Sequence, residues 1–178
     1  MAVENLKSLS ITNLDAQPVV ANTAGEGGPG YLWNTNDFVI PSAASTAAST
    51  YRMCRVPSNA IIKAVWFESQ AQGAGTFDIS VYYTDSPYEG QAPGGSGAVV
   101  PTTGSQFFAN GIAVTSAVLS TNEINQSGNN PPNLRNTELW SALGLTTDPG
   151  GFFDIVVVTN VALTTGTGQV GVRVEYVW

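Results

Sequence analysis

Short runs of apolar and β-branched residues recur along the whole chain, separated by stretches rich in glycine, proline, serine and asparagine. Residues 76–83 alternate regularly, with Phe77 and Ile79 on one face and Asp78 on the other. Residues 169–178 alternate in the same way. A period of two residues is typical of a β-strand with one buried face. Both segments are therefore predicted to be half-buried strands.

Residues 51–67 consist of two apolar runs on either side of Pro57-Ser58-Asn59. Because these residue types favour tight turns, the segment is predicted to form a hairpin at the centre of the fold. Residues 152–159 are apolar on both faces, as in a strand at the middle of a sheet or under an interface. Residues 107–114 contain Asn110-Gly111, which favours a second hairpin, although a single extended segment remains open.

Only one segment carries a helical pattern. Residues 137–143 follow a capping asparagine and precede Gly144, and their apolar spacing predicts a short helix. The apolar positions of residues 1–34 are too sparse to predict an amphipathic helix, and this part is interpreted as an extended N-terminal arm and loop. Residues 35–178 are predicted to form one all-β domain, a β-sandwich or jelly roll of about eight strands.

The composition fits that fold class and excludes several functions. Of the 178 residues only 11% are charged, whereas 19 are glycine and 10 are proline, as expected for short strands joined by many turns. The net charge of −7 has the wrong sign for binding nucleic-acid phosphates or an anionic membrane surface. The absence of histidine removes Ser-His-Asp and Cys-His nucleophiles and histidine-bound zinc.

Cys54 is the only cysteine, so an intramolecular disulfide is excluded. Its place in a strand pattern predicts a small buried side chain, with a reactive or intermolecular thiol as the alternative. The first residues lack a basic region followed by an apolar run, and no apolar stretch approaches 18 residues. The protein is therefore expected to be made and kept in the cytosol unless it leaves as part of a larger assembly.

Carboxylates are the only plausible catalytic groups, because two of them suffice for general acid and base catalysis. Asp78 and Asp154 lie within predicted strands, and Asp85, Glu89 and Asp148 lie in loops. They follow no dyad or metal-loop spacing, so we expect solvated strand faces and turn residues, with a weak calcium site as a minor alternative. No catalytic residue, cofactor or metal is predicted, and the protein is interpreted as non-enzymatic.

Two sets of residues are candidates for binding. Arg52, Arg55 and Lys63 lie on adjoining predicted strands and could pair with carboxylates of a partner subunit, although pairing within the chain is equally open. Aromatic side chains that could stack on a glycan are Trp33, Tyr82, Tyr83 and Tyr88. Trp66 and Trp140 lie in patterns typical of a core and are not included.

Four motifs point to a known family. They are Tyr-Arg-Met-Cys-Arg-Val-Pro-Ser-Asn-Ala at residues 51–60, Phe-Asp-Ile-Ser-Val-Tyr at 77–82, Leu-Trp-Ser-Ala-Leu-Gly-Leu at 139–145 and Gly-Val-Arg-Val-Glu-Tyr-Val at 171–177. In these motifs the chain resembles a family of small virion structural proteins of tailed phages. The match covers about residues 50–178 and leaves the arm and the glycine-rich loop around Gly94 unmatched.

The resemblance implies a head decoration or cement protein, often a trimer, with no catalytic residues to carry over. We therefore expect a capsid decoration protein that binds the outer surface of a tailed-phage head and stabilises it. Its partners would be the major capsid protein and itself, as a homotrimer, and it would be synthesised in the host bacterial cytoplasm and located on the virion. The alternative is a tail, neck or fibre component, with host-glycan binding as a further role.

Overall fold

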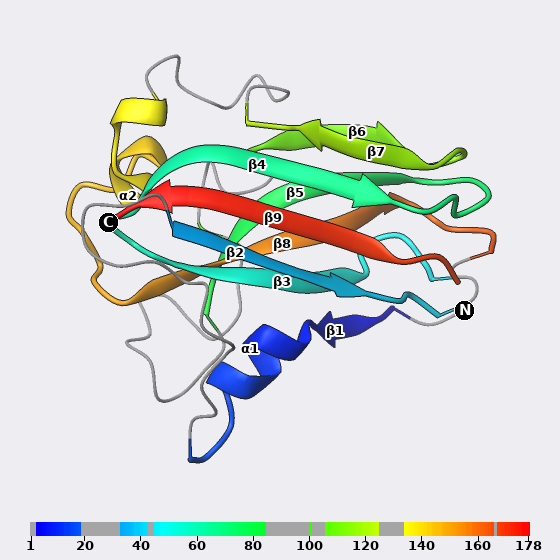
Figure 1. The fold of residues 1–178 in the computed structure, drawn as a ribbon, viewed down its shortest axis with the longest axis horizontal. Coiled ribbons are helices and arrows are strands. Elements are labelled where there is room, and N and C mark those ends of the chain that lie inside the picture. Colours follow the sequence, from blue (N-terminus) through cyan, green and yellow to red (C-terminus); the bar gives the residue numbers. More distant parts are fainter. Residues whose placement is uncertain are drawn as a thin grey trace.

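Two β-sheets pack face to face in the computed structural model, which describes residues 3–18, 33–42, 45–84, 100, 106–124, 134–165 and 167–178 (Figure 1). The strands are β1 (Asn5–Lys7), β2 (Trp33–Val39), β3 (Thr50–Pro57), β4 (Ile61–Ser69), β5 (Thr76–Tyr83), β6 (Ala109–Ala113), β7 (Val118–Asn122), β8 (Phe152–Val161) and β9 (Val170–Val177). The helices are α1 (Leu9–Leu14), the 3-10 turn η1 (Leu134–Asn136) and α2 (Leu139–Ala142).

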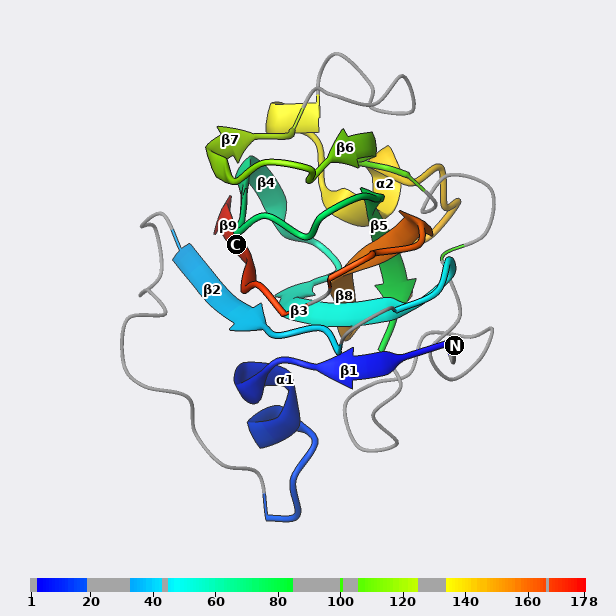
Figure 2. The same cartoon turned by 90° about the vertical axis from the view of Figure 1, so that its right-hand side faces the viewer.

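The strand order is that of a jelly roll. One sheet has the order β2-β9-β4-β7 and the other β1-β3-β8-β5-β6. All neighbouring strands are antiparallel except β1 and β3, which are parallel. Successive strands from β2 to β5 and from β7 to β9 cross between the sheets, as Figure 2 shows end-on. The prediction of an all-β sandwich is confirmed, and β5 and β9 lie where their alternation predicts them.

The predicted central hairpin is wrong in its pairing, although its two strands and its turn exist. β3 hydrogen-bonds to β8 in the five-stranded sheet, whereas β4 pairs with β9 in the other sheet. The turn between them, closed by the Ala60 N–H donating to the Pro57 carbonyl at 3.1 Å, therefore carries the chain from one sheet to the other. Turn residues predict a reversal of direction, but not whether the next strand pairs with the previous one.

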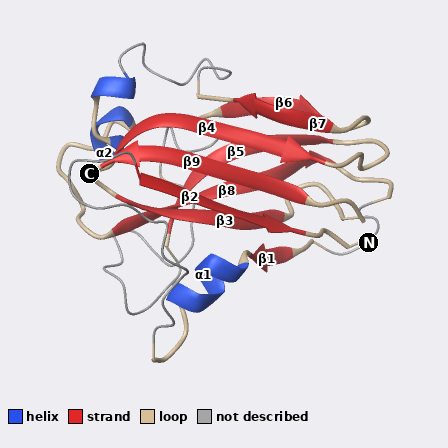
Figure 3. Ribbon diagram, viewed as in Figure 1, coloured by secondary structure: helices blue, strands red, loops and turns tan. Residues whose placement is uncertain are grey.

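Helix α2 closes the sandwich at this turn (Figure 3). The N–H groups of Leu139 and Trp140 donate to the carbonyls of Ala60 and Ser58 at 2.8 and 3.0 Å. The turn thus accepts from N–H groups at the start of the helix, which have no partner within it. The helix is shorter than the predicted 137–143 and ends before Gly144, whose φ of +75° is readily adopted by glycine.

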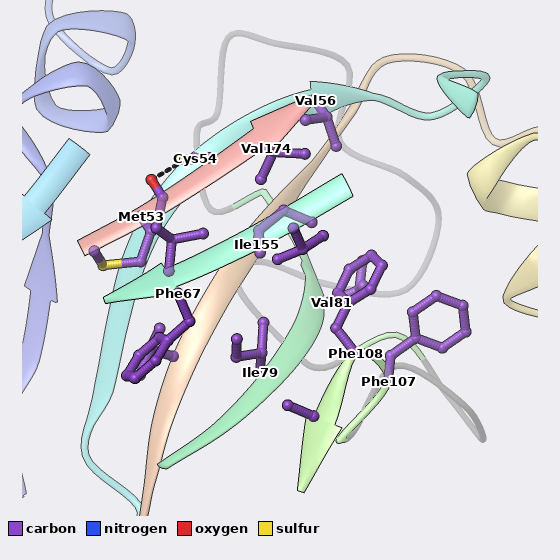
Figure 4. Close-up of a cluster of buried hydrophobic side chains, with 14 of the residues drawn as sticks. Met53, Cys54, Val56, Phe67, Ile79, Val81, Phe107, Phe108, Ile155 and Val174 are labelled. Atoms are coloured by element: carbon purple, nitrogen blue, oxygen red, sulfur yellow. Dashed lines mark hydrogen bonds between the residues drawn. The ribbon is translucent and has the colours of Figure 1, made fainter. Parts of the chain in front are cut away.

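The core fills the space between the sheets with side chains from almost every strand. Phe77 packs edge to face against Tyr51 and Phe67, with ring centroids 6.0 and 6.1 Å apart. Figure 4 shows the neighbouring part of this core, including Ile79 and Ile155. Cys54 is fully buried there, and its thiol donates to the Val172 carbonyl at 3.4 Å, so its prediction as a buried side chain is confirmed.

The first residues fold onto the five-stranded sheet and include a helix that the sequence pattern does not predict. Strand β1 pairs with β3, and Ser8 starts α1 by accepting from the Ile11 N–H at 3.4 Å. Ile11 is buried. Six residues are too few for a helical period to stand out, so packing rather than propensity stabilises α1. The division between an arm and a domain at residue 34 stays a prediction, and residues 19–32 lie outside the described part.

The Asn110-Gly111 pair lies within strand β6 rather than in a hairpin turn. Gly111 has φ of +73°, and its N–H donates to a carboxylate oxygen of Asp78 at 2.7 Å. The same carboxylate accepts from the Gln106 side chain at 2.9 Å. Asp78 is therefore a buried hydrogen-bond acceptor and not the solvated residue expected, because Gln106, Gly111 and Asn160 surround its carboxylate.

Candidate binding and assembly surfaces

A buried carboxylate on the outer face of the five-stranded sheet holds two arginines. Asp154 on β8 is fully buried, and its neighbours Phe153 and Ile155 point into the core, so it points away from it. Arg52 Nη1 lies 2.7 Å from Asp154 Oδ2, and Arg55 Nε lies 2.7 Å from Oδ1. A second Arg55 contact, Nη2 to Oδ2 at 3.2 Å, makes this pair bidentate, the strongest arrangement of such groups.

This ion pair extends to the N-terminal segment. Arg55 Nη1 lies 2.7 Å from Asp15 Oδ1, and Lys7 Nζ lies 2.7 Å from Asp15 Oδ2. Asp15 is the residue that ends α1, so the pairing fastens the helix to β3. We call Lys7, Asp15, Arg52, Arg55 and Asp154 the ion network. It joins β1, α1, β3 and β8 through charged side chains, in addition to the backbone pairing of β1 and β8 with β3.

The electrostatics of the network follow from its burial. Burial alone would lower the pKa of the Arg55 guanidinium, but hydrogen bonds and charges from Asp154 and Asp15 raise it above its ordinary value. Burial likewise acts to raise the pKa of Asp15, and hydrogen bonds from Lys7 and Arg55 overcome this and lower it. Both groups therefore stay ionised around neutral pH, as the pairing requires.

The structure places the three candidate basic residues in contacts within the chain. Arg52 and Arg55 are 8% and 6% exposed and share Asp154, which is the alternative that the sequence left open. Lys63 donates a hydrogen bond to the carbonyl of Arg135 in η1. Only Arg52 and Arg55 are brought together, and the pairing of all three with a partner subunit stays a prediction.

Of the four candidate glycan-stacking residues, only Tyr82 and Tyr83 have described side chains, and these lie on opposite faces of β5. Tyr83 is 4% exposed and packs on Phe153 with ring centroids 5.8 Å apart, so neither ring face is open to a sugar. Tyr82 lies on the outer face, where Arg52 sits 5.6 Å from its ring centroid. Burial raises the pKa of both tyrosines. Tyr88 and the side chain of Trp33 lie outside the part of the chain that the structure describes.

The outer face of the four-stranded sheet differs from that of the other sheet, and the sequence pattern does not predict it. Trp66 on β4 lies on this face rather than in the core, and its Nε1–H donates to Glu175 at 3.0 Å. Arg173 sits 5.3 Å from the Trp66 ring centroid and 3.4 Å from the Glu175 carboxylate. Phe38 on β2 is 52% exposed beside them. Phe38 on β2 lies opposite Gly171 on β9. An apolar residue opposite a glycine could have indicated this face, but the pair can be recognised only when the register of the two strands is known.

No group of three or more histidine, cysteine or acidic side chains that could hold a metal ion exists within the described ranges. Among the helices of these ranges, none is long and apolar enough to cross a membrane.

The sequence matches no protein-family model and no curated protein. Among solved structures, a chain of the cyanophage Pam1 capsid asymmetric unit is similar to this chain, with 18% sequence identity over 92% of this chain and 96% of that one. The TM-score is 0.41, at which the similarity carries no conclusion about function.

Replacing Asp154 with asparagine should destabilise the protein strongly. The change keeps the shape of the side chain but removes the buried negative charge that Arg52 and Arg55 share, so that Asp15 alone is left to pair with Arg55. Removing one partner of a buried ion pair costs about 3–5 kcal/mol of unfolding free energy. Urea unfolding at neutral pH measures this loss. Lys7→Met is the control, because its pair with Asp15 is 35% exposed at the lysine side chain and is worth about 1 kcal/mol at most. Equal losses in the two variants would contradict the importance of Asp154.

The contribution of Asp15 should depend on pH. Its pKa in the folded chain lies below the ordinary value of 3.8, so its stabilisation is fully present above that value. The stabilisation is lost as pH falls from there through the folded pKa. Asp15→Asn should therefore lower the unfolding free energy by about 1–2 kcal/mol at neutral pH, and the difference from the parent should shrink in acid. A difference that stays constant down to about pH 2 would contradict the pairing.

Proposed function

We propose that the protein is a non-enzymatic virion structural protein, a capsid decoration or cement protein that binds the outer surface of a tailed-phage head and stabilises it. The observation that carries the proposal is the jelly-roll strand order, β2-β9-β4-β7 against β3-β8-β5-β6. Viral capsid domains use this architecture, and so do lectins and cupins, so the fold limits the candidate functions by analogy alone. The motifs of residues 51–60 and 139–145, which resemble those of tailed-phage virion proteins, favour the capsid role among these candidates.

The chemistry of the described residues is consistent with a role in assembly. Asp78 and Asp154, two strand carboxylates considered as catalytic groups, are buried and accept hydrogen bonds from other residues of the fold. A catalytic carboxylate needs access to substrate, which neither has. The outer face around Phe38 and Trp66 is open instead, and exposed apolar groups suit contact with other subunits.

The mechanism of stabilisation would be mass action. A protein that binds the assembled shell and not its dissociated subunits stabilises the shell, by about 2.7 kcal/mol per site when its concentration is a hundredfold above its Kd. The symmetry of a shell repeats the contact at every equivalent position, so modest contacts add up. The partners in this proposal are the major capsid protein and two further copies of this chain in a homotrimer, and the place is the surface of the virion.

The copy number in the virion tests this proposal. A decoration protein should be present on the order of hundreds of copies per particle, in a fixed ratio to the major capsid protein, because it follows the lattice. Quantitative mass spectrometry of purified virions, with isotope-labelled peptides of both proteins as standards, measures the ratio. A few to a few dozen copies would contradict decoration and favour a tail, neck or fibre component.

A further inference from the structure

The outer face of the four-stranded sheet contains two adjoining hollows of about 290 and 320 Å³. Both are lined by Phe38 on β2 and Glu68 on β4. Arg173 and Trp66 line the first, and Leu119 on β7 lines the second. Together they form one groove across the sheet, which we call the Glu68 groove.

The backbone keeps this groove open. Gly171 on β9 pairs with both Phe38 and Glu68, and a Cβ at this position would lie 3.0 Å from Glu68 Cγ and Oε1. A side chain at position 171 would therefore require the Glu68 side chain to shift by a few tenths of an ångström. Opposite Glu68, a register irregularity in β7 includes Ser120 at φ +32°, a conformation that side-chain-bearing residues rarely adopt. Strain of this kind is often kept where it orients a functional side chain.

Two apolar side chains in the lining of the groove are unusually exposed. Leu119 is 86% exposed and Phe38 is 52% exposed, and each lines the hollow beside Glu68 from a different strand. Isolated exposed apolar residues are common, but two of them on either side of a carboxylate form a defined shape. That shape would accept a side chain with an apolar stem.

Among the residues that the structure describes, none pairs its charge with the Glu68 carboxylate. Arg173, the nearby cation, pairs with Glu175, which also accepts from Trp66. Within the described ranges the Glu68 side chain takes part in no hydrogen bond or ion pair, although its backbone belongs to the ladder of β4 and β9. The net charge of −7 adds a long-range attraction for a cation and a repulsion between copies of the chain.

We propose that the Glu68 groove binds a lysine or arginine side chain presented by an extended segment of a different protein. The aliphatic stem would lie between Phe38 and Leu119, and the cationic head would meet the Glu68 carboxylate, as long basic side chains do where apolar surface adjoins an anion. A sugar fits less well, because Arg173 already lies over the Trp66 ring. A second copy of this chain is disfavoured as the occupant of this particular groove, because its net charge of −7 has the same sign as the Glu68 carboxylate, and the proposed homotrimer would use another surface.

Nuclear magnetic resonance on the full ¹⁵N-labelled chain tests the proposal. The probe is a capped pentapeptide, acetyl-Gly-Val-Lys-Val-Gly-amide, and the matched peptide carries norleucine, which keeps the stem and removes the charge. The lysine peptide should shift the amide signals of Glu68, Leu119 and Gly171 to saturation, and the norleucine peptide should bind at least about tenfold more weakly, since one charge-assisted contact is worth about that much.

Variants separate the two parts of the groove. Glu68→Gln should weaken the lysine peptide about tenfold without altering the fold, and Leu119→Ala should weaken both peptides by a similar factor. Glu138→Gln is the control, because it removes the same charge from an exposed residue outside the groove. Glu138 accepts a hydrogen bond from the Trp140 side chain of α2. Unchanged binding in Glu68→Gln would overturn the assignment of the carboxylate.

Three other results would overturn the proposal. Equal affinity for the two peptides would make the groove a purely apolar contact. Shifts of the same amides by monosaccharides, with none from the lysine peptide, would make it a glycan site. Shifts that depend on protein concentration without any peptide would make it a contact between copies. Because the purified chain alone is used, none of these results depends on the proposed role in the virion.

Discussion

The carboxylate of Asp154 stands in the middle of an apolar strand at the centre of a five-stranded sheet, and the surrounding elements are arranged around its charge. A buried carboxylate without a partner is costly, so β8 must lie beside the strand that supplies Arg52 and Arg55. That strand has a register irregularity between Arg52 and Cys54, which brings both arginines to the same face. Through Arg55 the charge reaches Asp15, so the fold of the N-terminal segment depends on the same interaction.

The ion network also explains why the two outer faces of the sandwich differ. The face of the five-stranded sheet is taken up by α1, by paired charges and by the buried Val156, and most of its polar groups already have partners. The face of the four-stranded sheet has neither an α-helix nor a buried ion pair among its described residues, and it presents Phe38 and Leu119 to solvent. Intermolecular contacts of the sandwich are therefore expected on the second face and at its edge strands.

The sequence predicts what local patterns determine and misses what depends on the register. The alternation of residues 76–83 and 169–178 predicted two strands correctly, because burial of one face imposes a period. The apolar character of β8 and the glycine after α2 also predicted the correct elements. The pairing of β3 with β8 rather than β4 is a property of the whole topology. Asp154 could not be recognised as the partner of Arg55, because residues 99 positions apart meet only through that pairing. The Glu68 groove could not be predicted for the same reason, since Glu68 on β4 and Gly171 on β9 lie opposite each other only in the register of these neighbouring strands.

Whether this sandwich stabilises a phage shell from outside can be tested by adding the purified protein back to shells that lack it. The temperature at which the shells release their contents is then measured as a function of protein concentration. This temperature should rise with concentration and level off when the lattice sites are filled, as expected for a ligand that binds only the assembled state. A disruption temperature that does not change over the concentration range at which the protein is seen to bind would contradict a stabilising role.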